Sequence, residues 1–320
     1  MGLILFYFVL NQCALASGLD SGALNFLVIG DWGGLPYSPY TTGVQVANAK
    51  MMGLVANQTN SSFVVALGDN FYFTGVQDEH DGRFFKTFEH VYSASSLHIP
   101  WYVVAGNHDH YGNASAQIAY SKLNPIWNFD YYYYSKQWKI PGTNKTMKLI
   151  MIDTVQLCGN SGVDGSQPQG PEDPESSEEQ WRWLEKELAT SSDDYLLVGG
   201  HFPVWSIAEH GPTKCLVKRL IPMLEEYHVT AYINGHDHNL QHILPDNSTV
   251  NYFVIGCSNF VDFRVTHKHS IPEGSCKFHW ANIFKLGGFA HVYVDEHFMS
   301  LSFVDSDGGI LYTQKMKPRL

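Results

Sequence analysis

Short apolar runs, rich in β-branched residues, recur along the chain, and each ends in Gly or Asn followed by a polar cluster. Five such runs begin at Phe26, Phe63, Tyr102, Tyr195 and Val229. An apolar run of this length is typical of a buried strand, and the polar residues after it are typical of a functional loop. We therefore expect five buried strands, each with candidate site residues at its carboxyl end.

Helical patterns separate these runs. They cover residues 44–58, 84–92, 176–188 and 212–227. Ser176 and Glu179 form a capping-box pattern in the third segment, and Pro222 is expected to kink or shorten the fourth. Strands that alternate with helices predict parallel sheets, in which sites form at the carboxyl ends of the strands. The five polar clusters should then share one edge.

The pattern changes after Val250. Shorter runs at 252–255, 290–294, 299–304 and 310–314, with a hairpin signal at Asp307-Gly308-Gly309, predict a second, more antiparallel sheet. Residues 159–175 are rich in Gly, Ser, Pro and acidic residues, which predicts an exposed loop open to proteolysis. The 320 residues are 44% hydrophobic and 16% charged, so we expect one domain with a large core over residues 18–320.

The first 17 residues have the pattern of a signal peptide. An apolar run from Leu3 to Leu10 precedes Ala14-Leu15-Ala16, a small-residue cleavage signature. A transmembrane anchor is the alternative, but it needs about 20 apolar residues, and Asn11 and Gln12 interrupt the run. We expect cleavage of residues 1–17 and a lysosomal or secreted protein.

Charge narrows the range of partners. The chain carries 20 basic and 31 acidic residues, a net charge of −11 at pH 7. This balance offers no basic stripe for a nucleic-acid backbone and argues against such a partner. The 16 histidines raise the charge in an acidic compartment, because imidazole titrates near pH ~6.5, so repulsion of anionic substrates weakens there.

Sequons and cysteines agree with an oxidising compartment. The Asn-X-Ser/Thr sequons begin at Asn57, Asn60, Asn113, Asn144 and Asn247. Loss of Cys13 with the signal peptide leaves an even set: Cys158, Cys215, Cys257 and Cys276. Four cysteines allow about three pairings. We favour Cys158 with Cys215 and Cys257 with Cys276, and buried free thiols are the alternative.

The polar clusters combine carboxylate, imidazole, amide and phenol groups, which are ligands for Fe, Zn and Mn. A lone Gly-Asp after a strand is usually a turn. All five clusters in one chain, Gly-Asp-Trp-Gly, Gly-Asp-Asn-Phe-Tyr, Gly-Asn-His-Asp, Gly-His-Phe-Pro and Gly-His-Asp-His-Asn, indicate a metal site.

This series resembles the metallophosphoesterase signature in its purple acid phosphatase form. The match runs from Asp31 to His238, and Gly-Cys-Ser-Asn-Phe-Val-Asp at 256–262 resembles the small, animal-type tartrate-resistant enzymes. The resemblance implies an α/β fold: a two-sheet β-sandwich of βαβ units flanked by helices, in four α/β/β/α layers. It also implies that loop cleavage by an activating protease raises activity.

The resemblance implies two metal ions. Asp31, Tyr72 and His238 would hold Fe(III), while Asn107, His201 and His236 would hold a divalent ion (Fe, Zn or Mn), and Asp69 would bridge both. A phenolate favours Fe(III), so Tyr72 is the discriminating residue. Its alternative role is an aromatic core residue beside Phe71 and Phe73.

The implied reaction is hydrolysis of phosphate monoesters, such as phosphoproteins, nucleotides and small phosphates, by in-line attack of a metal-bound hydroxide. His108 is the first candidate for protonating the leaving group or stabilising phosphoryl charge, and His210 is the second. Asp262 resembles a peripheral residue that can orient an imidazole. We expect supporting roles for Asp109, His110 and Asp237.

Three alternatives stay open. The same metals serve phosphodiesterases and nucleases, although Tyr72 and the acidic surface argue against these. A secreted iron-binding protein needs the ligands but neither His108 nor His210. Radical chemistry by an iron couple is expected only as a side activity.

Overall fold

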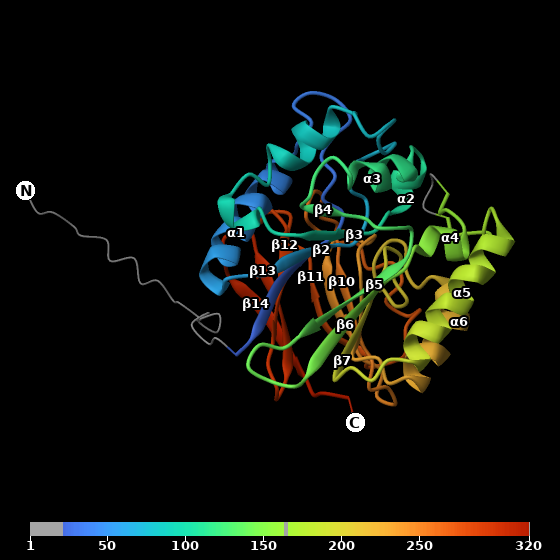
Figure 1. The fold of residues 1–320 in the computed structure, drawn as a ribbon. Coiled ribbons are helices and arrows are strands. Elements are labelled where there is room, and N and C mark those ends of the chain that lie inside the picture. Colours follow the sequence, from blue (N-terminus) through green and yellow to red (C-terminus); the bar gives the residue numbers. More distant parts are fainter. Residues whose placement is uncertain (1–21, 163–165, 320) are drawn as a thin grey trace, which may run out of the picture.

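The computed structural model describes residues 22–162 and 166–319, so the predicted signal peptide lies outside the described residues. Two seven-stranded sheets face each other, with helices outside them (Figure 1). This arrangement confirms the predicted two-sheet α/β fold. None of the described helices is long and apolar enough to cross a membrane.

The first sheet has the order β14-β13-β12-β1-β2-β3-β4. Its strands are β1 (Leu24–Ile29), β2 (Phe63–Ala66), β3 (Trp101–Val103), β4 (Trp127–Asn128), β12 (Gly288–Val294), β13 (Met299–Asp305) and β14 (Ile310–Met316). β1 to β4 are parallel, whereas β12 joins β1 antiparallel and continues into an antiparallel β13–β14 hairpin.

The second sheet has the order β11-β9-β10-β8-β7-β6-β5. Its strands are β5 (Tyr134–Lys139), β6 (Thr146–Met151), β7 (Tyr195–Gly199), β8 (Ala231–Asn234), β9 (Leu240–Ile243), β10 (Asn251–Ile255) and β11 (Cys276–Trp280). β6, β7, β8 and β10 are parallel, and β5, β9 and β11 run antiparallel to their neighbours.

The prediction that the residues after Val250 form a second, more antiparallel sheet of their own is wrong. β10 instead pairs parallel with β8 in the second sheet, while β12 to β14 extend the first sheet. The hairpin signal at Asp307-Gly308-Gly309 does join β13 to β14. The local sequence pattern predicted that these segments are strands. Which sheet each strand joins depends on partner strands far away in the sequence.

Strand alternation divides the core. On β7, Tyr195 and Leu197 belong to the core that includes the space between the sheets, whereas Leu196 and Val198 face the outer helices.

The helices are α1 (Gly43–Thr59), η1 (Phe84–Glu89, a π-helix), η2 (Ser95–Leu97), α2 (Asn107–His110), α3 (Ala114–Tyr120), α4 (Thr154–Cys158), α5 (Pro174–Ala189) and α6 (Lys214–Glu226). α1 contacts β1 and β12, while apolar faces of α5 and α6 cover the second sheet.

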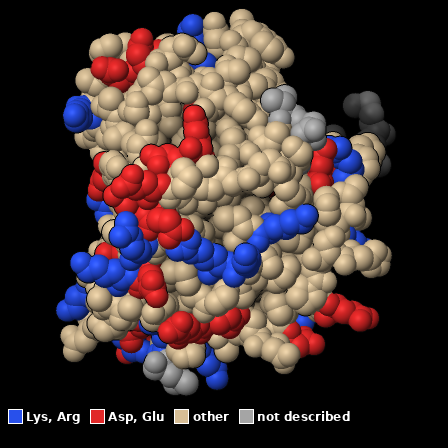
Figure 2. Space-filling model, turned by 90° about the vertical axis from the view of Figure 1, so that its right-hand side faces the viewer, with Lys and Arg blue, Asp and Glu red and all other residues tan. Residues whose placement is uncertain are grey.

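The outer face of α5 and α6 is charged. Figure 2 shows Lys and Arg side chains lying beside Asp and Glu on this side of the molecule. Arg219 of α6 pairs with Glu178 of α5, and its guanidinium lies 4.6 Å from the ring centroid of Trp181. The two helices are therefore joined by an ion pair over a shared apolar base.

The predicted capping box of Ser176 and Glu179 does not start α5. The N-cap is Asp173, whose carboxylate accepts from the backbone N–H groups of Glu175 and Ser176, and Pro174 occupies the first turn. Ser176 donates its hydroxyl to the same carboxylate. Asp followed by Pro is the stronger start signal, so the helix begins before Ser176. Pro222 does not end α6, which continues to Glu226.

One of the two favoured disulfides is present. Cys158 and Cys215 are bonded, which ties the end of α4 to α6. The pairing of Cys257 with Cys276 is wrong: both are free thiols. Cys257 is buried with its sulfur against the carbonyl of Gly288, whereas Cys276 is exposed at the start of β11. In the predicted loop, the described residues 166–173 are mostly exposed, but Ser161 is buried.

Candidate metal centre

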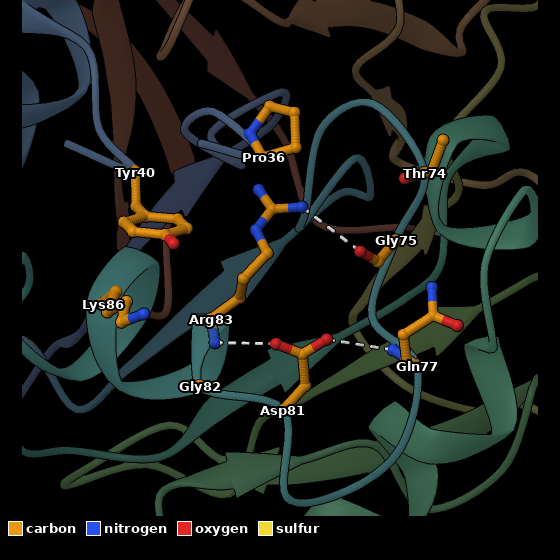
Figure 3. Close-up of a pocket in the computed structure, with 9 residues that line it drawn as sticks. All are labelled: Pro36, Tyr40, Thr74, Gly75, Gln77, Asp81, Gly82, Arg83 and Lys86. Atoms are coloured by element: carbon orange, nitrogen blue, oxygen red, sulfur yellow. Dashed lines mark hydrogen bonds between the residues drawn. The ribbon is translucent and has the colours of Figure 1, made fainter. Parts of the chain in front are cut away.

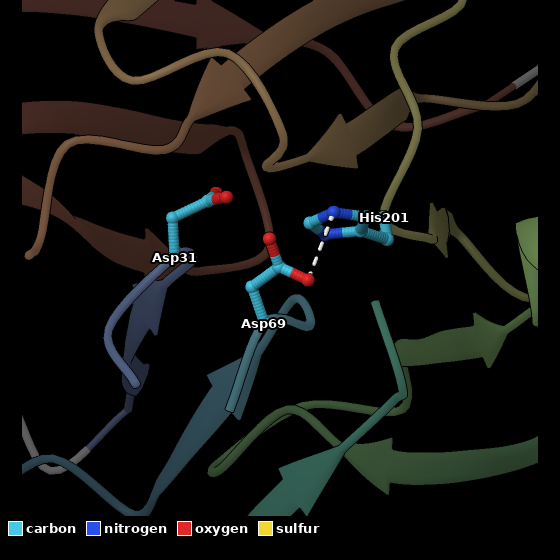
Figure 4. A group of neighbouring side chains, drawn as sticks. All are labelled: Asp31, Asp69 and His201. Carbon is cyan, nitrogen blue, oxygen red and sulfur yellow. Dashed lines mark ion pairs between the residues drawn. The ribbon is translucent and has the colours of Figure 1, made fainter. Parts of the chain in front are cut away.

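The five strands predicted to carry polar clusters end at one edge of the two sheets. β1, β2 and β3 reach it from the first sheet, and β7 and β8 from the second. The structure brings together all seven candidate ligands: Asp31, Asp69, Tyr72, Asn107, His201, His236 and His238. Asp31, Asp69 and His201 offer ligand atoms within 4.8 Å of one another (Figure 4).

Tight backbone turns place these side chains. Asp31, Asp69 and His236 have positive φ angles of 54°, 51° and 73°, which is uncommon outside glycine. A Cβ on Gly106 would lie 2.2 Å from Oδ1 of Asp69, and one on Gly235 would lie 2.3 Å from Oδ2 of Asp31. The glycines of these motifs therefore make room for the carboxylates.

Asp31, Tyr72 and His238 form one half of the cluster. The Tyr72 hydroxyl lies 2.9 Å from Oδ1 of Asp31 and 2.9 Å from Nε2 of His238. His238 Nε2 is 3.5 Å from the same Asp31 oxygen. Three donor atoms from three strand ends thus converge on one point.

Asn107, His201 and His236 form the other half. Oδ1 of Asn107 lies 2.8 Å from Nε2 of His201 and 3.0 Å from Nδ1 of His236. Asp69 Oδ1 is 3.4 Å from Nε2 of His201, and a carboxylate oxygen of Asp69 lies within 4.8 Å of one of Asp31 in the first half. Asp69 therefore adjoins both halves.

The oxygen atoms around His201 favour a positive charge at its imidazole. Its Nδ1 donates to the carbonyl of Leu67 at 2.9 Å, which leaves Nε2 facing the oxygens of Asn107 and Asp69. Those contacts require either a second proton or a metal ion. Burial opposes protonation, yet Asp69 raises the pKa of His201 to about 9, so the location strongly favours a cation.

Tyr72 leads to the same conclusion. It is fully buried, and burial followed by the charge of Asp31 raises its pKa well above the ordinary value. A phenolate here therefore needs compensating positive charge. A trivalent metal ion supplies that charge and prefers a phenolate ligand. The donor set fits two metal ions.

Both predicted catalytic histidines line a pocket of about 90 Å³ at this centre. Nδ1 of His108 donates to the carbonyl of Phe73 at 2.7 Å, and its Nε2 lies 4.0 Å from Oδ2 of Asp69. The ring of His210 packs against that of His236 at a tilt of 31°, with centroids 4.1 Å apart. Both rings are thus fixed beside the proposed ligands.

The expected supporting residues hold the surrounding loops. Asp109 accepts from the backbone N–H groups of Asn70, Phe71 and Gly106 and from the Gln117 amide. Asp237 accepts from the N–H of His210 at 3.0 Å, and His110 contacts Asp153 at 2.7 Å. Each carboxylate ties together parts of the chain that lie far apart in sequence.

Asp262 behaves differently from the expectation. Its N–H donates to the carbonyl of His238 at 2.8 Å, but its carboxylate pairs with Arg264 and not with an imidazole.

Sequence reasoning missed part of the pocket wall. Tyr111 and Ser161 line the pocket, and the Tyr111 hydroxyl donates to the carbonyl of Ser161 at 2.6 Å. Tyr111 lies two residues after Asp109, the last residue of the third motif, which was a usable signal. Ser161 lies in the segment predicted as an exposed loop, and no local pattern marked it.

Comparisons with known proteins agree with the geometry. Residues 24–240 match the calcineurin-like phosphoesterase family, which defines the class of the fold and site. Tartrate-resistant acid phosphatase type 5 of Homo sapiens is 48% identical over 313 residues, covering 96% of each chain. The Mus musculus protein of the same name is 49% identical over 298 residues, covering 92% of this chain and 91% of that protein.

More distant relatives extend the group. Purple acid phosphatase 17 of Arabidopsis thaliana is 31% identical over 302 residues, covering 92% of this chain and 81% of that protein. The solved structure of a purple acid phosphatase from yellow lupin shares the fold, with a TM-score of 0.63, 16% identity, and coverage of 92% of this chain and 54% of that one. The chain belongs to the tartrate-resistant purple acid phosphatases of the calcineurin-like family, and it is a phosphatase.

Proposed function

We propose that this phosphatase hydrolyses phosphate monoesters in acid at a centre of two metal ions, Fe(III) and a divalent Fe, Zn or Mn ion. The observation that carries the proposal is the position of the buried Tyr72 hydroxyl, 2.9 Å from both Asp31 and His238. A phenol shared between a carboxylate and an imidazole is a hard donor set suited to Fe(III).

The two halves of the cluster would hold different ions. Asp31, Tyr72 and His238 would hold Fe(III). The neutral donors of Asn107, His201 and His236 suit a divalent ion, and Asp69 would serve both. Two such ions orient a phosphoryl group, neutralise its charge and lower the pKa of bound water.

The chain's own residues handle the leaving group. Because Nδ1 of His108 donates to the Phe73 carbonyl, its Nε2 is the nitrogen free to act in the pocket, and in the imidazolium form Nε2 carries a proton that it can donate. His210 also lines the pocket, with its ring against that of His236, and can stabilise phosphoryl charge when protonated. Its backbone is fixed by Asp237, which limits reorganisation during the reaction.

Location and regulation are further parts of the proposal. The Cys158–Cys215 disulfide supports an oxidising compartment, consistent with a secreted or lysosomal enzyme. Small phosphates, nucleotides and phosphoproteins are the proposed substrates. The exposed segment after Ser166 is a proposed cleavage site for an activating protease; unchanged turnover after a single cut there would remove that part.

Substrate choice tests the reaction class. Hydrolysis of p-nitrophenyl phosphate should exceed that of bis-p-nitrophenyl phosphate at acid pH, because a monoester presents more oxygens to paired cations. A preference for the diester would instead assign the chain to phosphodiesterases. Binding of iron without hydrolysis of either compound would indicate an iron-binding role.

A further inference from the structure

Arg83 is a buried cation outside the proposed ligand set. It precedes η1, and only 7% of its surface is exposed. It lines a hollow of about 300 Å³ with Tyr40 and Lys86, where its guanidinium points toward Gly75 (Figure 3). A buried charge is costly unless it gains strong partners, so the identity of those partners shows what the residue does.

Both partners are backbone carbonyls. Nη1 donates to the oxygen of Gly75 at 3.2 Å, and Nη2 donates to the oxygen of Gly33 at 2.7 Å. Burial lowers the pKa of Arg83 to about 10, so the side chain stays charged at neutral and acid pH. Two charge-assisted bonds from one planar group fix the separation of their acceptors.

These two carbonyls belong to the loops that carry Asp31 and Tyr72. Gly33 follows Asp31 by two residues, and Gly75 follows Tyr72 by three. The Gly33 oxygen also accepts from the N–H of Tyr72 at 3.1 Å. The Gly33 carbonyl therefore accepts two hydrogen bonds, one from the N–H of Tyr72 and one from Arg83. Arg83 also binds Gly75, at the other end of the Tyr72 loop.

The two loops have no spare room. A Cβ on Gly33 would lie 2.6 Å from the backbone oxygen of Asp69 and 2.6 Å from the backbone nitrogen of Phe71. The guanidinium carbon lies 5.3 Å from the ring centroid of Phe71, directly before Tyr72. Nε of Arg83 has no hydrogen-bond partner. The side chain therefore provides donors to the carbonyls of both loops while one of its own donors stays unpaired.

We propose that Arg83 is a positioning residue that clamps the Asp31 and Tyr72 loops together and so sets the geometry of these two side chains in the metal centre. The inference rests on the proposed function for its link to Fe(III), but the clamp itself is a property of the chain. Lys gives one compact donor group that can reach only one carbonyl, so Arg83→Lys should keep the charge and loosen the clamp.

The test compares Arg83→Met and Arg83→Lys with Lys86→Met, which removes an exposed cation from the same hollow. Amide hydrogen exchange is measured in the segments 31–34 and 71–76, together with the visible spectrum of the iron-loaded protein. Both Arg83 variants should show faster exchange in the two segments and a shifted or weaker tyrosinate band. Values of kcat should fall by about 10- to 100-fold, because small displacements of reacting groups are costly. Lys86→Met should match the wild type.

Local exchange and band position equal to those of the wild type in both Arg83 variants would overturn the clamp. A uniform loss of stability with unchanged exchange in the two segments would also overturn it. If Arg83→Met does not fold, Arg83→Lys decides the question. A wild-type protein without a tyrosinate band would refute the ferric assignment, and amide exchange would still decide the role of Arg83.

Discussion

The rings of His210 and His236 lie against each other at an interplanar angle of 31°, with their centroids 4.1 Å apart. His236 is a proposed metal ligand and both rings line the pocket, so this contact connects the metal centre with the substrate space. Burial, followed by the nearby charge of His210, lowers the pKa of His236 well below its ordinary value. A neutral His236 is the form that binds a metal ion.

His210 is therefore expected to do more than pack. His210→Phe keeps an aromatic ring on His236 but removes the proton, whereas His210→Ala removes both. If His210 binds or protonates the phosphoryl group, both variants should lose about 10²-fold or more in kcat/KM. Steady-state kinetics of the wild type and both variants, at matched metal content, measures this loss. Wild-type activity in His210→Phe would show that the ring only packs.

His108 is expected to protonate the leaving group. His108→Ala should reduce kcat for an alkyl phosphate by about 10²- to 10⁴-fold, because an alkoxide leaves poorly without a proton. The loss for p-nitrophenyl phosphate should be smaller, since its phenolate leaves readily. Equal losses for both substrates would contradict this role and favour binding of phosphoryl charge instead.

A buried histidine outside the candidate metal centre should make stability depend on pH. His291 is 2% exposed, its Nε2 contacts Asn25 at 3.0 Å, and burial lowers its pKa to about 4. The unfolded chain takes up the proton near pH ~6.5, so folding is progressively disfavoured as pH falls from there toward 4, by up to about 1.4 kcal/mol per pH unit.

His291→Gln should flatten that part of the pH dependence. Urea unfolding of both proteins at pH 7, 6 and 5 measures the difference, and Gln can still donate to Asn25. His297→Gln, at an exposed position, serves as the control. A variant that loses stability between pH 7 and 5 as steeply as the wild type would contradict the assignment.

The Cys158–Cys215 disulfide should contribute substantially to stability. It closes a loop with a sequence separation of 57 residues. Replacing both cysteines with serine should lower the free energy of unfolding by about 4 kcal/mol through loop entropy. Chemical denaturation under oxidising conditions measures this, with Cys276→Ser, an exposed free thiol, as the control. Equal stabilities of the double variant and the control would be evidence against it.

The strand ends could be predicted because their signals are local. Each motif places a glycine, a turn and a ligand within a few residues, and close approaches such as Gly106 to Asp69 explain the glycines. The topology then brings motifs from two sheets to one edge, which alternating strands and helices already indicated. These signals place the five motifs at this edge, whereas the choice of the seven candidate ligands within them rests on the resemblance to purple acid phosphatases and stays a prediction.

Long-range relationships could not be read in this way. Cys257 and Cys276 are close in sequence, but one is buried against Gly288 and the other is exposed, which depends on how β10 to β12 are distributed between two sheets. Arg83 carries no motif at all. Its importance depends on two carbonyls, those of Gly33 and Gly75, that come together only in the fold.

The central claim is that Tyr72 binds Fe(III) in a centre of two metal ions. The most direct measurement is the visible absorption spectrum and metal content of the purified protein and of Tyr72→Phe. We predict two metal ions with a purple tyrosinate-to-iron band in the wild type and loss of that band in the variant. A colourless or zinc-only wild-type protein, or a band that survives in Tyr72→Phe, would contradict the ferric assignment.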